Sequence, residues 1–498
     1  MTGEGPPSGG EGGAPRAAGP RGTAGAHGPR TAGDGLEFEP LTAVADAVRE
    51  GRLSPVDLVS RQLARAKTIG AALGAFITVA EDQAMEDAAR LESALSSGAV
   101  AGPLHGVPVT VKDNVAVAGL RLTAGSGLFA DRVADEDAPS VARLRRAGAV
   151  VLGKTNLSEL AFGSSHPAFG EPLNPWDPGL STGGSSSGSA SALAAGIGYG
   201  SVGTDTGGSI RIPASMCGLV GLKPTFGLVE LDGVVTISRE LDHVGPLART
   251  VGDAALLLEV MARDGWERRR RLASLEGVTD GLRLGVLPDE ELEGVHPDAA
   301  AAVARARDAL VAAGCAPVVV SLPDRALAKT TMWTLGAADL LVDLEAHLWG
   351  PGMGEGLRAA LQRAADTSAA AYVKARRARD ELTREVDALF ASVDLLLTPG
   401  VPVPAHPTAQ RAALRDVRQA YTPLFDLTGH PALVVPAALS REGLPLGVQL
   451  VGRRCADDVV LGAGLVVERE VGSLWAREDV RSRVSANLAE LPARRPAA

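Results

Sequence analysis

The spacing of apolar residues predicts two helices early in the chain. Val56, Val59, Leu63 and Ala66 recur at helical spacing behind the tetrapeptide Ser54-Pro55-Val56-Asp57. That tetrapeptide is typical of a helix start, because serine can cap a helix, proline fits its first position and aspartate favours its first turn. A second helix is predicted over residues 81–96. We expect ordered structure to begin shortly before them, near Leu36.

Beyond residue 100, short apolar runs alternate with helical segments. Strands are predicted over 107–111, 147–152, 317–320 and 395–397, and helices over 140–146 and 190–195. Strands that alternate with helices indicate an α/β fold with a parallel or mixed sheet. The length of 498 residues alone favours two or three domains.

The two ends of the chain differ in composition from the rest. Residues 1–35 are almost entirely Gly, Pro, Ala, Arg and Thr, and such a segment buries too little apolar surface to offset its ordering entropy. A similar stretch runs from Pro492 to Pro496. The sequence therefore predicts a disordered tail over 1–35, an ordered domain over 36–485 and a flexible tail over 486–498.

Composition and charge narrow the class of partner. Apolar residues make up 45% of the chain, which indicates a globular protein, and the net charge of −10 argues against nucleic acid as a partner. The one dense basic run, from Arg268 to Arg271, is typical of a solvated helix or loop. We therefore expect a small-molecule partner.

Cysteine usage and hydropathy indicate the compartment. Cys217, Cys315 and Cys455 are odd in number and far apart, so they predict neither a disulfide framework nor a zinc site. No apolar run has the roughly 20 residues that a bilayer requires. Residues 1–10 lack the apolar region of a secretion signal. A cytoplasmic protein without a membrane partner is predicted.

Two glycine-rich runs are the first candidates for chemistry. They are Thr182-Gly-Gly-Ser-Ser-Ser-Gly-Ser189 and Gly203-Thr-Asp-Thr-Gly-Gly-Ser-Ile-Arg211. Backbone N–H groups of such turns can point at one anion, either a bound phosphate or the oxyanion of acyl transfer. The phosphate-binding patterns Gly-Lys-Ser/Thr and G-x-G-x-x-G are missing here. A purely structural turn stays an open alternative for each run.

A serine nucleophile needs a base to remove its proton. None of the eight histidines has a recognisable triad context, and we expect structural or surface roles for the two nearest the glycine-rich runs, His105 and His243. Lys112 ends the apolar run 107–111, where burial would favour its neutral form. Taken alone, this lysine is also compatible with a surface or ion-paired position.

These features occur together in an order that resembles the amidase signature family of Ser–Ser–Lys hydrolases. Lys112 and Ser185 are 73 residues apart, and Ser209 follows 24 residues later. The resemblance extends over about 36–480. It includes Gly102-Pro-Leu-His-Gly-Val-Pro108, Val111-Lys-Asp-Asn114, Arg146-Ala-Gly-Ala-Val-Val-Leu-Gly-Lys-Thr-Asn156, Asn174-Pro-Trp176, Ile212-Pro-Ala-Ser-Met-Cys-Gly-Leu-Val-Gly-Leu-Lys-Pro-Thr225, Leu241-Asp-His-Val-Gly-Pro246, Leu397-Thr-Pro399 and Gly443-Leu-Pro-Leu-Gly-Val-Gln-Leu450.

The resemblance implies one large α/β/α domain whose mixed β-sheet is covered by helices on both faces, in place of several domains. It implies that Ser209 forms the acyl-enzyme, Ser185 relays the proton and Lys112 is the base. The peptide bond that leads into the relay serine is cis in this family. The oxyanion hole would consist of the backbone amides of Thr206, Gly207, Gly208 and Ser209, with Asp205 and Arg211 as structural supports. Neither a metal nor a cofactor is expected.

Several alternatives stay open. The glutamine-hydrolysing subunit of the tRNA-dependent amidotransferase shares this fold and catalytic set, but its usual Tyr-Asp-Gly-Val-Arg-Tyr segment is missing from 357–397. An esterase or carbamate hydrolase and a non-catalytic relative are further alternatives. Small departures from the family, at Ser187 and in Leu228-Val-Glu-Leu231, concern substrate preference.

The sequence leaves the amide substrate and the assembly unidentified. Phe129, Met332 and Trp333 are candidates for an apolar pocket, with ordinary packing the favoured alternative. A homodimer is neither indicated nor excluded.

Overall fold

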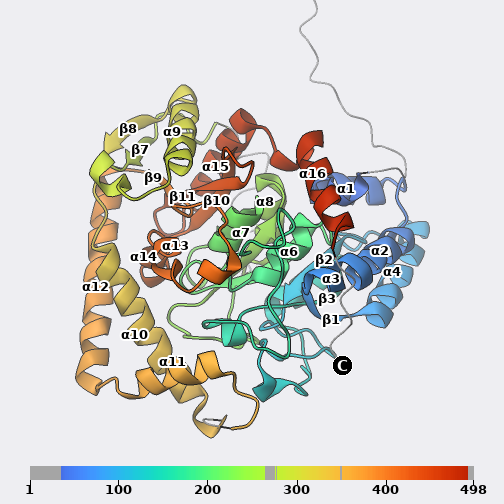
Figure 1. The fold of residues 1–498 in the computed structure, drawn as a ribbon. Helices are drawn as coiled ribbons and strands as arrows, with labels where there is room; N and C mark the ends of the chain where they lie inside the picture. The colour runs from blue at the N-terminus through green and yellow to red at the C-terminus, as the bar shows by residue number, and fades with distance from the viewer. Residues whose placement is uncertain (1–34, 264–274, 276, 348–349, 492–498) are drawn as a thin grey trace, which may run out of the picture. The chain divides into compact units, whose positions relative to one another are not determined.

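The computed structural model describes residues 35–263, 275, 277–347 and 350–491. Contacts divide the chain into Met1–Leu36 and Glu37–Ala498, and the fold is that of the second unit. Its described residues form one sheet of eleven strands (Figure 1). The strands are β1 Phe76–Val79, β2 Pro108–Lys112, β3 Val150–Thr155, β4 Gly200–Asp205, β5 Val220–Lys223, β6 His243–Ala248, β7 Arg283–Val286, β8 Ala316–Val319, β9 Leu395–Pro399, β10 Ala432–Leu439 and β11 Pro445–Gly452.

The sheet is mixed. Its strand order is β1-β3-β2-β4-β6-β5-β10-β11-β9-β7-β8. Strand β2 runs parallel to β3 and β4, and β7 runs parallel to β8 and β9. The other neighbours are antiparallel. Strand β2, which ends at Lys112, therefore lies beside β4, which ends one residue before Thr206.

Helices cover both faces of this sheet. Gly200 and Gly203 of β4 are three residues apart, so side chains at these two positions would point to opposite faces of the sheet. A Cβ at Gly200 would meet Leu257 of α8 (Val251–Met261), whereas one at Gly203 would meet Ile210 and Ser186, which precede α7 (Arg211–Cys217) and α6 (Ser187–Ala194). The prediction of a mixed sheet between two helical layers is confirmed.

The other helices lie on this sheet or around it (Figure 1). Helices α10, α11 and α12 form a group at the lower left of the view, away from α2 and α4 on the right. The remaining α-helices are α1 Leu41–Arg49, α2 Pro55–Arg65, α3 Ala71–Leu73, α4 Glu81–Ser96, α5 Pro139–Arg146, α9 Pro297–Ala312, α10 Arg325–Asp343, α11 Glu355–Ala365, α12 Ala369–Ser392, α13 Arg415–Arg418, α14 Pro423–Leu427, α15 Asp457–Val471 and α16 Glu478–Ala489.

Several predicted elements have the expected bounds. Ser54 caps α2, since its Oγ accepts a hydrogen bond from Asp57 N (3.1 Å), and α4 covers 81–96. The predicted bounds of β3 are wrong. Because Gly148 (φ +92°) forms a turn, the strand runs over 150–155 instead of 147–152. Helix α6 begins at Ser187, three residues before the predicted start.

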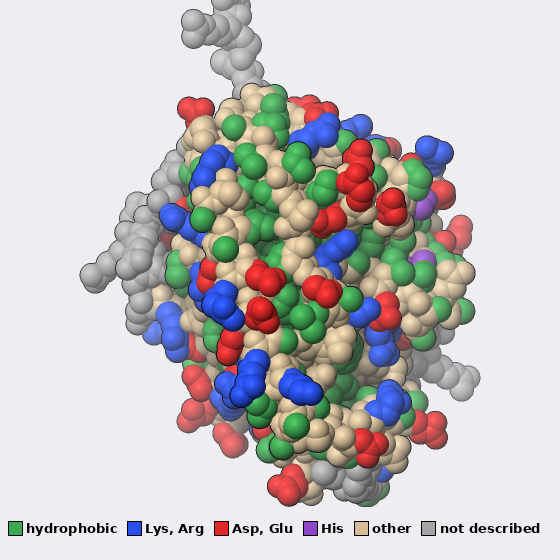
Figure 2. All heavy atoms as spheres, turned by 90° about the vertical axis from the view of Figure 1, so that its left-hand side faces the viewer, with side chains coloured by type: hydrophobic (Ala, Val, Ile, Leu, Met, Phe, Trp, Pro, Cys, Tyr) green, Lys and Arg blue, Asp and Glu red, His purple; other side chains and the backbone are tan. Residues whose placement is uncertain are grey.

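Helix α16 continues to Ala489, beyond the domain end predicted at residue 485. Three predicted features lie outside the described residues. They are residues 1–34 of the predicted N-terminal tail, the basic run Arg268–Arg271 and the stretch 492–496. Acidic and basic side chains are interspersed on the face in Figure 2. Within the described ranges, no helix combines the length and the apolar content that crossing a bilayer requires.

Candidate active site

Lys112 is held in the interior by the sheet itself. It is the last residue of β2, a strand with neighbours on both sides, and its side chain is fully buried. Its Nζ donates hydrogen bonds to Ser185 Oγ (2.8 Å), Thr204 Oγ1 (2.7 Å) and the Thr204 carbonyl (3.3 Å). The structure thus places the predicted base at hydrogen-bonding distance from the predicted relay serine.

The surroundings of Lys112 favour a neutral amine. Burial lowers the pKa of Lys112 to about 7, although the charges of Asp205 and Asp242 act in the opposite direction. Asp242 is itself buried, which raises its pKa to about 6 even though it accepts hydrogen bonds from Thr206 Oγ1 (2.7 Å) and Ile237 N (2.8 Å). Near neutral pH the lysine can therefore exist without its proton.

Ser185 lies just before helix α6. The Gly184–Ser185 peptide bond is cis, as the resemblance implies. Ser185 is 5% exposed, and its carbonyl accepts a hydrogen bond from Ser158 N (3.3 Å). The next residue connects the two glycine-rich runs, because Ser186 N donates to the Ser209 carbonyl (3.1 Å). The two loops that carry Ser185 and Ser209 are thus joined by a backbone hydrogen bond.

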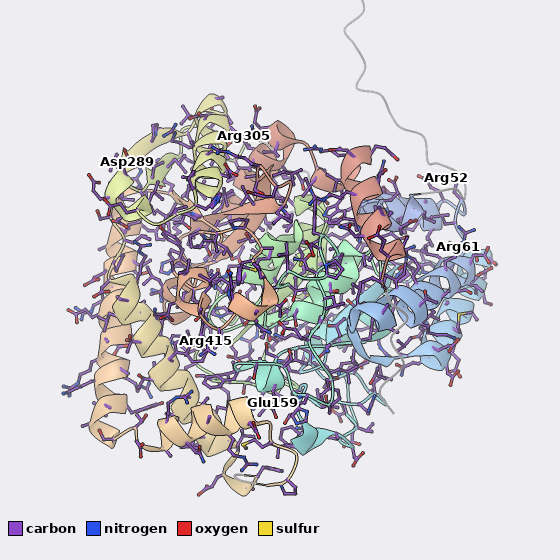
Figure 3. All side chains as sticks on the ribbon, in the orientation of Figure 1. Arg52, Arg61, Glu159, Asp289, Arg305 and Arg415 are labelled. Carbon is purple, nitrogen blue, oxygen red and sulfur yellow. The ribbon has the colours of Figure 1, made fainter. Side chains whose placement is uncertain are left out.

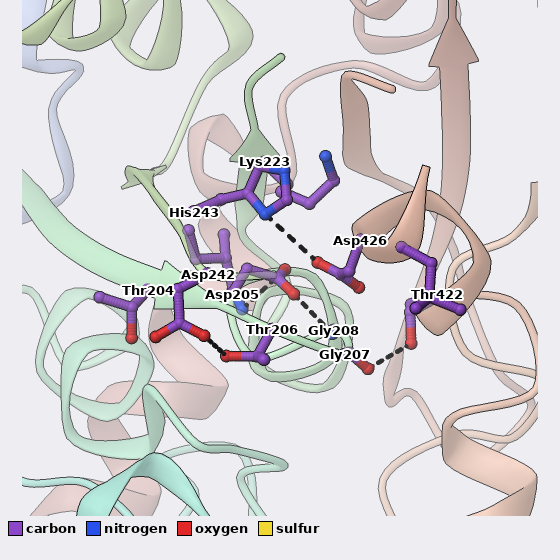
Figure 4. Close-up of polar contacts among 12 residues, drawn as sticks. Thr204, Asp205, Thr206, Gly207, Gly208, Lys223, Asp242, His243, Thr422 and Asp426 are labelled. Carbon is purple, nitrogen blue, oxygen red and sulfur yellow. Dashed lines mark hydrogen bonds and ion pairs between the residues drawn. The ribbon is translucent and has the colours of Figure 1, made fainter. Parts of the chain in front are cut away.

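Ser209 lies in the turn between β4 and α7 and is partly exposed. The Asp205 carboxylate shapes this turn by accepting hydrogen bonds from Gly208 N (2.5 Å), Ile210 N (3.1 Å) and Arg211 N (3.4 Å). Figure 4 shows the bond between Asp205 and Gly208 at the centre of the site. Contacts of this kind are expected of the structural support that the resemblance implies for Asp205.

Arg211 ties the turn to the C-terminal part of the chain. Its guanidinium donates to both carboxylate oxygens of Asp205 (2.9 and 3.0 Å), to Asp426 (2.5 Å) and to Gln449 Oε1 (2.8 Å). Burial alone would raise the pKa of Asp205, but the Arg211 charge and hydrogen bonds outweigh it and hold that pKa well below its usual range. Asp205 is therefore a permanent carboxylate.

The predicted oxyanion hole needs one correction. The N–H of Gly208 donates to Asp205 Oδ1, so this amide is already engaged. Gly208 has φ +115°, a conformation open to glycine and strained for other residues. The carbonyl of Gly207 accepts a hydrogen bond from Thr422 Oγ1 (2.7 Å; Figure 4). Three predicted donors to the oxyanion hole are left, the backbone amides of Thr206, Gly207 and Ser209.

Three polar residues around Lys112 were not anticipated from the sequence. Thr204 contacts Nζ through two oxygens, and Asn114 Nδ2 donates to Thr204 Oγ1 (3.1 Å). Asp242 adds a buried carboxylate that acts on the lysine. Thr204 belongs to the same glycine-rich run as Ser209, and Asn114 follows Lys112 by two residues, but only the pairing of β2 with β4 reveals that they meet.

The remaining candidates have packing or structural contacts. His105 is fully buried, with Nδ1 accepting from Ala101 N (3.0 Å) and Nε2 lying 3.0 Å from the Leu91 carbonyl. His243 is buried beside Lys223 and Asp426, and burial lowers its pKa well below the usual value (Figure 4). Among the described residues, no group of three His, Cys, Asp or Glu side chains could hold a metal ion.

Phe129, Met332 and Trp333 belong to apolar clusters, as the packing alternative predicted. Met332 and Trp333 lie in one cluster, and Phe129 and Trp333 pack against another. The Trp333 ring also contacts Phe162 edge to face, at 4.8 Å between centroids. Met332 also lies close to Gly207, since a Cβ at Gly207 would be 2.9 Å from Met332 Cε. Met332 is therefore the candidate that borders the nucleophile turn.

Comparisons with known proteins agree with this site. The family model Amidase matches residues 57–461. A glutamyl-tRNA(Gln) amidotransferase subunit of Synechococcus sp. (strain CC9311) is 36% identical over 454 residues, 83% of this chain and 93% of that protein. A crystal structure of an amidase is 34% identical, with a TM-score of 0.78, and covers 87% of this chain and 100% of that one.

A further solved structure is the peptide amidase from Stenotrophomonas maltophilia. It is 31% identical with a TM-score of 0.76, and covers 87% of this chain and 96% of that chain. The chain belongs to the amidase signature family. It is a hydrolase of that family, acting on C–N bonds.

Proposed function

We propose that this chain is a free-standing amide hydrolase that cleaves a carboxamide through an acyl-enzyme on Ser209. The observation that carries the proposal is the 2.8 Å contact between a fully buried Lys112 Nζ and Ser185 Oγ. A buried amine with a pKa of about 7 is suited to accept a proton from a hydroxyl group near neutral pH.

The proposed proton route is supported by the contact between Lys112 and Ser185 and is completed by the relay that the family resemblance implies. Neutral Lys112 accepts the proton of Ser185 while Ser185 accepts that of Ser209, and Ser209 Oγ attacks the amide carbonyl. Thr204 Oγ1 and its carbonyl hold the ammonium that forms, at 2.7 and 3.3 Å from Nζ. The proton then returns through Ser185 to the leaving nitrogen. Water repeats the cycle on the ester and releases the acid.

The developing negative charge on the substrate oxygen requires donors that are already in place. We assign this role to the amides of Thr206, Gly207 and Ser209. The Asp205 carboxylate, held by Arg211, fixes the conformation of the turn through Gly208, Ile210 and Arg211. Since the chain itself makes these contacts, the turn needs little rearrangement during the reaction.

A fluorophosphonate probe tests the nucleophile. Wild-type protein should carry one phosphonyl adduct on Ser209, located by mass spectrometry of peptides, and Ser209→Ala should carry none there. Ser191→Ala, at a buried serine of helix α6, serves as the matched control and should label normally. Labelling that persists unchanged in Ser209→Ala would refute the assignment.

A second candidate is a glutamine-hydrolysing subunit of an amidotransferase, favoured by the 36% identity to such a subunit. The two functions differ in their need for partners. We expect the isolated chain to hydrolyse simple carboxamides in a screen of aliphatic, aryl and amino-acid amides. Turnover of glutamine alone, and only in the presence of a partner subunit, would favour the second candidate.

A further inference from the structure

Residues 406–419 run alongside both loops of the active site. At one end, Ser181 N donates to the His406 carbonyl (2.8 Å), next to the first glycine-rich run. A Cβ at Gly184, the neighbour of the relay serine, would lie 3.0 Å from Arg411 Nη2. At the other end, a Cβ at Gly207 would lie 3.4 Å from Gln419 Nε2. The segment therefore borders the site from the relay side to the oxyanion side.

The segment is rich in positive charge. Arg411, Arg415 and Arg418 lie on it, and Arg411 pairs with Glu171 and donates to Ser158 Oγ (3.0 Å). The guanidinium of Arg415 lies over the Trp333 ring, 5.5 Å from its centroid. The acid of the same segment, Asp416, pairs with Lys329 (3.2 Å). Glu171 is thus the one carboxylate, among the described residues, that pairs with any of the three arginines.

Arg418 is a buried arginine without an ion pair among the described residues. It is only 7% exposed, and no described carboxylate lies within ion-pair distance of it. Its Nη2 donates to the Arg411 carbonyl (2.9 Å), but its Nε has no acceptor among the described residues. Burial and the charges of Arg411 and Arg415 lower the pKa of Arg418 to about 10, although the charge of Glu171 acts in the opposite direction. A buried cation without a directly paired carboxylate is costly, and an anion placed beside it recovers part of that cost.

A second buried polar group lies on the same segment. The ring of His406 is buried beside the Pro404 backbone and has no side-chain hydrogen-bond partner among the described residues. Burial and the charge of Arg418 lower the pKa of His406 to about 4, so this ring is neutral. Guanidinium groups bind planar carboxylates with two parallel hydrogen bonds. Met332 borders the nucleophile turn at Gly207, and Trp333 lies under the guanidinium of Arg415, so apolar surface that suits a short hydrocarbon chain adjoins both the turn and the arginine segment.

We propose that residues 406–419 bind a carboxylate of the substrate, so that the amide cleaved at Ser209 carries a carboxylate a few carbons away. This inference rests on the proposed amide hydrolysis and names its substrate class. Glutaramate has this chemistry, pentanamide lacks the carboxylate, and glutamine adds an ammonium that the arginines repel.

The test compares kcat/KM for these three amides. Wild-type protein should prefer glutaramate to pentanamide by about tenfold or more, the factor expected for one charge-assisted hydrogen bond, and should prefer glutaramate to glutamine. Arg418→Gln and Arg415→Gln should reduce that preference at least fivefold, through a higher KM for glutaramate. Figure 3 labels Arg415 and, well apart from it, Arg305 of α9. Arg305→Gln, a change at an exposed arginine, is the matched control and should keep the wild-type preference.

The outcomes separate this inference from the function on which it rests. Equal turnover of glutaramate and pentanamide by wild-type protein overturns the carboxylate site while leaving amide hydrolysis intact. So does an equal loss on both amides in the two variants. If the buried Arg418→Gln fails to fold, the exposed Arg415→Gln alone decides. No hydrolysis of any amide, together with no label on Ser209, contradicts the proposed function itself.

Discussion

At the scale of single residues, the balance at Lys112 between burial and charge decides its chemistry. Burial removes water from the ammonium, while Asp205 and Asp242 favour it, and the net result is a pKa of about 7. The hydroxyls of Ser185 and Thr204 can accept from an ammonium or donate to an amine. The same contacts therefore serve both protonation states of the catalytic cycle.

The pH dependence of activity follows from this pKa. Because the base must be neutral, kcat/KM for a neutral amide should rise with pH through an ionisation near 7 and then level off. Lys112→Met should lower kcat/KM by about 10³-fold, the usual range for a general base, and remove this ionisation. A stopped assay from pH 5 to 9 measures both. A profile of unchanged shape in Lys112→Met would exclude the lysine as the base.

The same group makes stability depend on pH. Between about pH 7 and 10.5 the unfolded state binds a proton at Lys112 that the folded state lacks, so the wild-type free energy of unfolding rises with pH there. Lys112→Met cannot titrate. Relative to wild type, its stability should therefore fall by about 2–3 kcal/mol from pH 6 to pH 9, as measured by urea unfolding. Lys67→Met, at a lysine half-exposed to water, is the control and should show a constant difference.

At the scale of elements, the turn between β4 and α7 depends on two glycines with different surroundings. A Cβ at Gly208 would clash with Thr422 Oγ1 and lie 2.7 Å from Ile212 Cδ1, with φ at +115°. A Cβ at Gly207 would meet mainly the flexible end of Met332, at 2.9 Å. The first position is fixed by the backbone and by packed neighbours, whereas the second can adapt by moving one side chain.

Alanine substitutions at these glycines should therefore differ. Gly208→Ala should lose at least about 2 kcal/mol of stability, because strain and overpacking add. Gly207→Ala should fold with a smaller loss, and Met332→Ala should cost less stability in the Gly207→Ala chain than in the wild-type chain, because it removes the crowding at Met332 Cε. Thermal unfolding of Gly208→Ala, Gly207→Ala, Met332→Ala and the Gly207→Ala/Met332→Ala double variant measures these differences. Equal losses at both glycines, with additive effects of Gly207→Ala and Met332→Ala, would contradict the different surroundings of the two glycines.

Elements and site were predictable to different extents. Helix α4 and the Ser54 cap follow from periodicity and local capping chemistry. The start of β3 does not, because Gly148 ends the preceding segment with a left-handed turn that apolar content does not reveal.

Lys112 and Ser185 were predicted as site residues from spacing and resemblance. Asn114 and Asp242 were not, since their proximity depends on strand register and loop paths. Arg418 lies in a segment without any recognisable pattern.

At the scale of the whole molecule, elements from the C-terminal part of the chain share an apolar cluster with elements from the N-terminal part. The Trp475 ring stacks on Phe38, at 5.5 Å between centroids, and contacts Trp176 edge to face at 5.8 Å. Its Nε1 donates to the Gly218 carbonyl (2.6 Å), directly after α7. Val480 and Val484 of α16 belong to the same apolar cluster. Residues from opposite ends of the sequence therefore depend on each other for burial.

The two ends of the chain should thus respond differently to change. Trp475→Ala removes a large, fully buried ring and its hydrogen bond, and should cost about 3–5 kcal/mol. Since the composition of residues 1–34 predicts a tail without a packed core, we expect their deletion to leave both Tm and kcat/KM unchanged. Val319→Ala, on an exposed edge strand (69% exposed), is the control for loss of an apolar side chain. If the truncation lowers Tm as much as Trp475→Ala does, residues 1–34 contribute to the core, and the domain cannot begin at Leu36.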